Sequence, residues 1–182
     1  MSSKYQIHGN YPYFLTLTVV AWIDVFTRNE YRQEIIDSIK YCQKHKGLSV
    51  FAWCLMTNHL HLVAKGDESN SLSDILRDMK THTSKAITRA IENNPRESRS
   101  KWMLNQFAFE ANKFTSKNMT YHFWQSDNHS EEIHTNQFLD QKIDYTHYNP
   151  VRAGFVAEPQ HYLYSSAIDY AGGKGLIDVI IP

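Results

Sequence analysis

Several features that define whole classes of protein are scarce in, or missing from, this sequence of 182 residues. Only two cysteines are present, Cys42 and Cys54, and no CxxC pair occurs, which excludes a disulfide framework and a cysteine-based zinc site. The longest uninterrupted apolar run, residues 50–56, is much shorter than the roughly 20 residues that cross a bilayer, so we expect no membrane span. Net charge is also absent, because Lys plus Arg and Asp plus Glu each number 19. A uniformly basic nucleic-acid coat protein is therefore excluded, whereas a local basic patch is not.

What is present is an ordinary globular composition, with 42% hydrophobic and 21% charged residues. The length suits one domain, or one domain with a tail, and a core large enough to need no disulfide. Two free thiols are typical of a reducing cytoplasm, so we expect a cytoplasmic protein. The ten histidines are numerous enough to direct the search toward metal ligands.

Hydrophobic periodicity predicts an α+β domain in which helices pack on an antiparallel sheet. Alternating apolar residues predict strands at 14–20 and 59–64. A run that is apolar on both faces predicts a strand covered on both sides at 48–56, followed by a turn or a kink at 57–58. Apolar residues at helical spacing predict helices at 27–46, 71–91 and 135–148, and a short helix at 102–109. Thr27 and Glu30 resemble a capping box at the start of the first helix, and Gly47 is typical of its end.

The most informative short segment is His59-Leu60-His61. In a strand, residues i and i+2 point to the same face, so the two imidazoles stand side by side while Leu60 points to the core. Their Cα atoms are then roughly 7 Å apart, a spacing from which both rings can reach one metal ion. Two ordinary half-buried histidines are the alternative interpretation, and an isolated HxH pair does not exclude it.

A second pair of functional groups lies near the end of the last predicted helix. Tyr145 and Asn149 are four residues apart, so a phenol and an amide share one helix face. Leu139 and Ile143 lie nearly opposite and can hold the helix to the sheet. Taken alone, Tyr145 is better explained as a structural residue, because the chain has eleven tyrosines.

Basic and aromatic side chains supply candidate contacts to nucleic acid, by following a phosphate backbone or by stacking on unpaired bases. The corresponding structural alternatives are a solvated helix face and a buried core, and we expect at least two of Tyr121, Phe123 and Trp124 to be core residues. The candidate contacts are Arg77, Lys80, Lys85, Arg89, Arg96, Arg99, Lys101, Trp124 and Arg152. Three further histidines match no metal-binding spacing and are interpreted as loop residues: His122, His129 and His134.

Residues 52–63, Ala-Trp-Cys-Leu-Met-Thr-Asn-His-Leu-His-Leu-Val, closely resemble the AY.LMPNHVHLL segment of single-tyrosine HUH transposases. Residues 123–125, Phe-Trp-Gln, and 143–154, Ile-Asp-Tyr-Thr-His-Tyr-Asn-Pro-Val-Arg-Ala-Gly, are similar to the WQ and DYIHxNPVxAG patterns of that family. Residues 162–172 resemble the C-terminal tail of the REP-associated tyrosine transposases, a domesticated branch. One departure is Thr57, where the family usually has proline, and another is the neutral net charge.

The resemblance implies a ferredoxin-like HUH domain at 1–156 with a C-terminal tail, residues 157–182, packed on it. His59 and His61 match the ligands of a divalent metal ion, Mg²⁺ or Mn²⁺, and Asn149 sits where the family places a third ligand. Tyr145 matches the nucleophile, which forms a 5′-phosphotyrosine bond and releases a 3′-OH.

The resemblance also implies the partners of the protein. The substrate would be single-stranded DNA next to a hairpin, and the location would be the nucleoid of a bacterial cell. Transposing relatives exchange the tyrosine helix between two chains, whereas domesticated relatives can act alone, so a homodimer stays open.

Two other functions stay open on the sequence. One is a catalytically idle regulator that binds DNA hairpins, although the intact set of His59, His61, Tyr145 and Asn149 favours catalysis. The other is a metallophosphoesterase in which the HxH pair binds metal and water is the nucleophile. That enzyme would form no protein–DNA adduct and would not need Tyr145.

Overall fold

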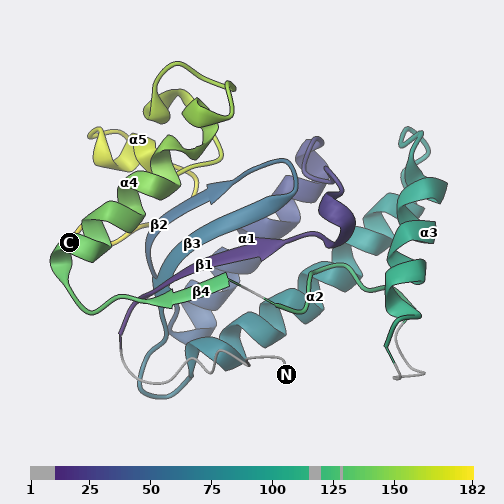
Figure 1. The fold of residues 1–182 in the computed structure, drawn as a ribbon, viewed down its shortest axis with the longest axis horizontal. Coiled ribbons are helices and arrows are strands. Elements are labelled where there is room, and N and C mark those ends of the chain that lie inside the picture. Colours follow the sequence, from purple (N-terminus) through teal and green to yellow (C-terminus); the bar gives the residue numbers. More distant parts are fainter. Residues whose placement is uncertain (1–10, 115–119, 128) are drawn as a thin grey trace.

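Residues 11–114, 120–127 and 129–182 are described by the structure, which is a computed structural model. In that part of the chain, four strands form one antiparallel sheet in the order β2-β3-β1-β4. They are β1 (Tyr13–Thr18), β2 (Ser49–Leu55), β3 (His59–Lys65) and β4 (His129–Glu132). The predicted α+β class with an antiparallel sheet is confirmed, and the arrangement is ferredoxin-like (Figure 1).

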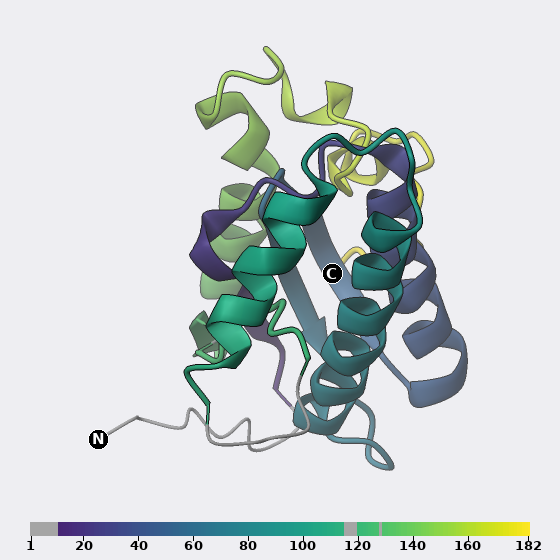
Figure 2. The ribbon, with the colours of Figure 1, turned by 90° about the vertical axis from the view of Figure 1, so that its right-hand side faces the viewer.

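Helices cover both faces of this sheet (Figures 1 and 2). The helices α1 (Asn29–Lys46) and α2 (Leu72–Glu92) pack against each other on one face. The helix α4 (Asn136–Arg152) lies on the opposite face, over β2 and β3. A further helix, α3 (Ser100–Ala111), packs on α2 and on the short 3-10 turn η1 (Val20–Trp22) that follows β1.

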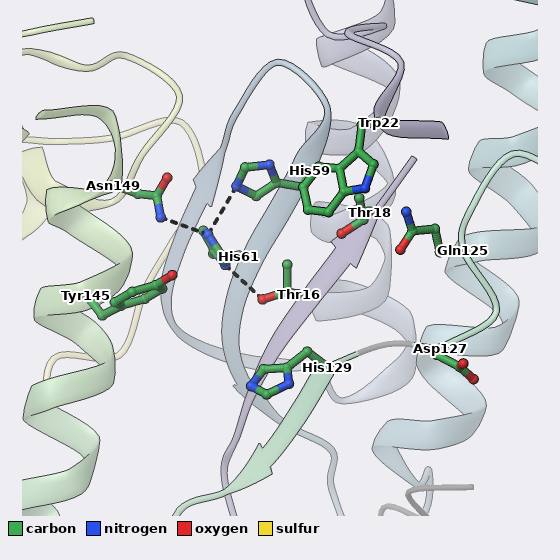
Figure 3. Close-up of a pocket in the computed structure, with 10 residues that line it drawn as sticks. All are labelled: Thr16, Thr18, Trp22, His59, His61, Gln125, Asp127, His129, Tyr145 and Asn149. Atoms are coloured by element: carbon green, nitrogen blue, oxygen red, sulfur yellow. Dashed lines mark hydrogen bonds between the residues drawn. The ribbon is translucent and has the colours of Figure 1, made fainter. Parts of the chain in front are cut away.

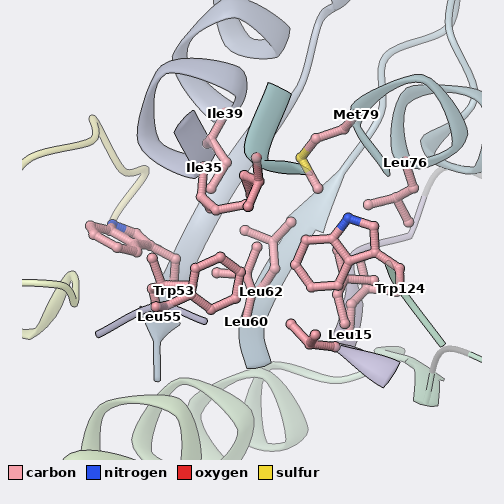
Figure 4. Packing of buried hydrophobic residues seen from close by; sticks show 14 of the residues in the cluster. Leu15, Ile35, Ile39, Trp53, Leu55, Leu60, Leu62, Leu76, Met79 and Trp124 are labelled. Atoms are coloured by element: carbon pink, nitrogen blue, oxygen red, sulfur yellow. The ribbon is translucent and has the colours of Figure 1, made fainter. Parts of the chain in front are cut away.

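Alternation along the strands divides the core into two layers. The larger layer, between the sheet and the helices α1 and α2, includes Leu15, Leu60 and Leu62 together with Ile35, Ile39 and Met79 (Figure 4). The smaller layer lies under α4 and contains Phe14, Ala52, Val63, Ile133, Leu139 and Ile143. Because side chains alternate along β3, His59 and His61 share the face of Val63 and therefore point toward α4.

The helix ends agree in part with the sequence signals. Gly47 ends α1 in the left-handed conformation, with φ 67°, as expected of a C-terminal glycine. The capping box was wrong, because α1 begins at Asn29 after Arg28 and no side chain caps it. Ser71 and Thr135 do cap α2 and α4, each through a side-chain oxygen that accepts a backbone N–H. Pro150 does not end α4, because it lies inside the last turn and the helix continues to Arg152.

The strand β4 is the part of the sheet that the sequence did not reveal. Its four residues are His-Ser-Glu-Glu, which carry no apolar alternation, and it pairs with β1 so that Thr16 faces His129. The interpretation of His129 as a loop residue was therefore wrong. In the segment before β4, a single bridge joins Trp124 to Val19.

The C-terminal residues run along β2, the other edge of the sheet. Backbone N–H groups of Ser166 and Ile180 donate to the carbonyls of Trp53 and Val50, and Leu55 donates to Tyr164. The short helices η2 (Pro159–His161) and α5 (Ala167–Tyr170) belong to this segment. Pairing with β2 satisfies backbone groups that an edge strand would otherwise expose. None of the helices in the described residues is long and apolar enough to cross a membrane.

Candidate active site

His59 and His61 lie side by side on β3, and their rings converge in front of α4 (Figure 3). The Nε2 atoms of the two rings are 3.1 Å apart. Thr16 and Thr18 face them across the β1–β3 pairing, so small polar side chains border the pair on β1. The expected placement of two imidazoles on one strand face is present.

Each ring has a hydrogen-bond partner at Nδ1, on the side away from the other ring. The amide of Asn58 donates to the carbonyl of Trp22, so its Oδ1 atom faces Nδ1 of His59 at 2.6 Å and accepts the proton there. The hydroxyl of Thr16 lies 3.0 Å from Nδ1 of His61. When Nδ1 of each ring donates outward, both Nε2 lone pairs point at one place, the arrangement that histidine ligands of metals usually show.

The helix α4 brings an amide and a phenol to the same place. The Nδ2 atom of Asn149 lies 2.9 Å from Nε2 of His61, and the ring of Tyr145 lies 5.4 Å from that of His61. Phe14 meets the Tyr145 ring edge to face at 5.5 Å, while the Tyr145 side chain stays 41% exposed. Leu139 and Ile143 are buried against the sheet and hold the helix in this orientation, as their spacing predicted.

The donor set of His59, His61 and Asn149 fits a divalent cation. Ligand atoms about 2.1 Å from one ion and at right angles to each other lie about 3 Å apart, which is close to the 3.1 Å between the two Nε2 atoms. The amide of Asn149 also carries an oxygen, a donor that Mg²⁺ and Mn²⁺ accept readily. No group of three or more His, Cys, Asp or Glu suited to a metal occurs among the described residues, so a third protein ligand beside the two histidines would have to be another group, such as the amide of Asn149.

Burial keeps the two imidazoles in the neutral form. It lowers the pKa of His61 to about 3, and positive charge on His59, His129 and Lys142 adds to that effect. Burial also lowers the pKa of His59. A neutral imidazole is the form that binds a metal ion, so neither ring has to lose a proton first at neutral pH.

These groups open into a cleft with a volume of about 510 Å³ (Figure 3). Tyr145 and Asn149 form one side of it, and the histidine pair forms the floor. Sequence reasoning missed six lining residues, which come from β1, η1, β4 and the segment before β4: Thr16, Thr18, Trp22, Gln125, Asp127 and His129. Only Gln125 carried a signal, because it belongs to the Phe-Trp-Gln block.

Two cations stand beside Tyr145. The guanidinium of Arg152 lies 5.1 Å from the centre of the Tyr145 ring, and the ammonium of Lys142 lies 6.0 Å from it. Lys142 is also held 2.7 Å from Glu131, which in turn lies 2.7 Å from His129. Because Glu131 offsets the charge of Lys142, Arg152 is the stronger candidate for a contact to a phosphate group at Tyr145.

The other predicted DNA contacts lie away from this cleft. Arg77, Lys85 and Arg89 are exposed on α2, on the opposite side of the sheet, and Arg77 is paired with two carboxylates. Arg96 and Lys101 are exposed near the start of α3, whereas Arg99 bonds to Asp24. Lys80 donates to the backbone carbonyl of Gln125 and so supports one wall of the cleft from behind.

Trp124 corrects the sequence interpretation. It is 3% exposed, packs against Phe26 and Phe123, and donates Nε1–H to Thr83. Trp124 therefore has no free face on which a base could stack, and the prediction that it contacts DNA is wrong. The expectation that at least two of Tyr121, Phe123 and Trp124 belong to the core is confirmed.

Comparisons with known proteins agree with the fold and the motifs. The model of the family described as "Transposase IS200 like" matches residues 10–124. A solved REP-associated tyrosine transposase bound to a REP hairpin is 19% identical, with a TM-score of 0.63 over 99% of this chain and 92% of that one. A protein of Deinococcus radiodurans R1 assigned as a transposase is 14% identical, with a TM-score of 0.44 over 80% and 95% of the two chains. No curated protein sequence matches this chain.

Proposed function

The chain belongs to the IS200-like transposase family, and from that premise we propose that it cuts and rejoins single-stranded DNA beside hairpins through a covalent bond to Tyr145. The observation that carries this proposal is the meeting of α4 with β3. It places a partly exposed phenol and an amide against a pair of histidines whose Nε2 atoms converge. A purely structural tyrosine would not need to lie beside a histidine pair and an amide.

In the proposed reaction, the phenolic oxygen of Tyr145 attacks the scissile phosphorus and loses its proton. The bond between phosphorus and the 3′ oxygen breaks, and that oxygen takes up a proton and leaves as a 3′-OH. The DNA segment on the other side of the cut stays linked to Tyr145 through its 5′ phosphate, as a phosphotyrosine. Because one phosphoester bond replaces another, the 3′-OH of a second strand can reverse the step without ATP.

The residues around Tyr145 have distinct roles in this scheme. His59, His61 and Asn149 would hold a divalent ion, Mg²⁺ or Mn²⁺, which when bound polarises the scissile phosphate and offsets its charge. Arg152 and Lys142 attract the same phosphate from the side of α4. Phe14 packs against the Tyr145 ring and limits its movement, so that the phenol keeps one approach to the phosphate.

A single strand is the substrate that this site suits, because in-line attack by a helix-borne tyrosine needs a backbone that can bend into the cleft. A hairpin as the adjoining element is supported by the REP hairpin complex of the structural relative. Such a substrate would place the protein with the chromosomal DNA of a bacterial cell.

An adduct assay tests the proposal. The protein is incubated with end-labelled oligonucleotides that carry a hairpin between single-stranded arms, in Mn²⁺, in Mg²⁺ and in EDTA. We expect a band that resists denaturant, requires metal and disappears in Tyr145→Phe. Tyr148→Phe is the matched control, because Tyr148 is an exposed tyrosine on the same helix that does not line the cleft.

The other two functions predict different results in the same assay. Cleavage without a covalent band, unchanged in Tyr145→Phe, would identify a hydrolase that uses water. Binding of the hairpin with neither cleavage nor adduct would identify a regulator.

A further inference from the structure

Trp22 is a large aromatic side chain that the fold leaves exposed at the candidate active site. Its side chain is 62% exposed, whereas its neighbours Val20 and Ile23 are buried. It lines the same cleft as the histidine pair, and its ring centre lies 6.4 Å from that of His59. Figure 3 shows Trp22 and Tyr145 on opposite sides of that pair, so four rings follow one another along the cleft.

The backbone under Trp22 is strained. Ala21 and Trp22 have φ angles of 52° and 56°, and they are the non-glycine residues with positive φ in the described part of the chain. Residues with a side chain avoid this left-handed region, and such strain persists only where surrounding contacts impose it, often at functional sites. A turn that needed only flexibility would be served better by glycine.

Three hydrogen bonds impose this conformation. The N–H of Trp22 donates to Val19 O at 3.1 Å, and the N–H of Ile23 donates to Val20 O at 3.3 Å. The side chain of Asn58 donates to the carbonyl of Trp22 at 3.2 Å. The same Asn58 accepts the proton of His59 Nδ1, so one amide positions both the Trp22 turn and a predicted metal ligand.

We propose that Trp22 is a stacking platform for one unpaired base of the DNA, at a nucleotide adjoining the scissile phosphate. This inference rests on the proposed function, because it takes the phosphate to lie at the histidine pair. The face of an exposed indole is the preferred partner of an unpaired base. Thr18 and Gln125 line the same side of the cleft and place polar groups where the edge of that base would lie (Figure 3).

Trp22 therefore acts as a positioning residue. Stacking tolerates any base, because every base has a π-face. Holding one base at the end of the cleft opposite Tyr145 would fix the course of the backbone across His59 and His61. The phosphate would then reach Tyr145 in one orientation.

Binding measurements without cleavage test this inference directly. The probe is a fluorescein-labelled DNA hairpin with mixed-sequence single-stranded arms, and EDTA prevents reaction while anisotropy reports affinity. We expect Trp22→Ala to bind about 5- to 100-fold more weakly, and Trp22→Phe to recover most of the affinity. Trp102→Ala is the matched control, since Trp102 is a 49% exposed tryptophan on α3 outside the cleft, and we expect it to bind like the wild type.

An abasic scan then locates the stacked base. Single abasic sites are placed in turn along the arms, and affinity is measured for the wild type and for Trp22→Ala. We expect one position at which base removal weakens the wild type but has little further effect on Trp22→Ala. Equal losses in both proteins at every position would overturn the inference.

The inference and the proposed function fail in different ways. If the wild type forms the metal-dependent adduct but Trp22→Ala binds as tightly as Trp102→Ala, the stacking platform is wrong and the nuclease stands. If binding depends on Trp22 and no adduct forms, the platform stands and the covalent chemistry is wrong. If the wild type binds no single-stranded DNA, both are wrong.

Discussion

The amide of Asn149 meets Nε2 of His61 at 2.9 Å, although the two residues are 88 positions apart in the chain. This contact joins β3, the strand that carries the HxH motif, to α4, the helix that carries Tyr145. A hydrogen bond between a helix and a strand needs no metal, but here the same imidazole nitrogen also faces His59 at 3.1 Å. A bound cation would instead be held by Nε2 of both histidines and by Oδ1 of Asn149.

Removal of the amide should weaken metal binding. We expect Asn149→Ala to lower Mn²⁺ affinity by about tenfold or more, and Asn149→Gln to retain part of it, because the longer side chain keeps the amide. Isothermal titration calorimetry with Mn²⁺ alone measures this without DNA. Asn136→Ala changes an exposed asparagine on the same helix and should bind Mn²⁺ like the wild type. An unchanged affinity in Asn149→Ala would remove Asn149 from the ligand set.

The complete residue set comes from a single chain, so one protomer should be sufficient. His61 contacts both Asn149 and Tyr145 within one chain. We therefore expect a mixture of Tyr145→Phe and His61→Ala proteins to form no more adduct than either alone. Recovery of adduct formation in the mixture would show instead that two chains exchange α4 or combine their residues.

The larger part of the fold could be predicted from the sequence, because the periodicity of a long helix or strand lies within its own segment. The helices at 29–46 and 72–92 and the strands β2 and β3 each carry their own periodicity, and Gly47 marks an end by its conformation. The strand β4 has no such pattern. Its register with β1 is set by pairing at Thr16 and His129, which is a tertiary interaction that no local window contains.

The candidate site also has a part that the sequence predicts and a part that it does not. His59 with His61, and Tyr145 with Asn149, are pairs whose spacing follows from strand and helix geometry. Their meeting depends on packing of α4 against the sheet, which spacing alone does not give. Trp22 was missed because its exposure arises from positive φ angles at two residues with side chains, a feature with no sequence signal.

Among the predicted DNA contacts, Arg152 should matter most, because it is beside Tyr145. We expect Arg152→Ala to weaken binding to single-stranded DNA and to reduce the slope of log affinity against log salt by about 0.7, the value of one phosphate contact. Fluorescence anisotropy over a series of NaCl concentrations measures both effects.

Arg77→Ala is the matched control for Arg152. Arg77 is exposed on the far side of the sheet and is already paired with Asp74 and Asp78. We expect the salt dependence of Arg77→Ala to equal that of the wild type. A loss of slope in Arg77→Ala but not in Arg152→Ala would place the DNA on α2 and away from the cleft.

Burial of His147 should make the fold sensitive to mild acid. This residue of α4 is 6% exposed, bonds to Ser166 through Nε2, and packs on Tyr170. Burial lowers the pKa of His147 from 6.5 to about 4. Between those values the unfolded chain binds a proton at this residue that the folded chain does not. Its contribution to stability is thus complete above pH 6.5 and is lost as the pH falls toward 4.

The loss should approach 1.4 kcal/mol per pH unit at most, because ~1.4 kcal/mol corresponds to one proton per unit. Urea unfolding of the wild type and His147→Gln at pH values from 7 to 4 measures it, since the variant lacks the titrating group. We expect the free energy of unfolding to fall less steeply with acid in His147→Gln than in the wild type. His161→Gln, at an exposed histidine of the C-terminal segment, should keep the steeper wild-type slope. Equal slopes in all three proteins would mean that protonation of His147 does not lower the free energy of unfolding. The neutral imidazole of His147 would then not be what holds α4 over β2.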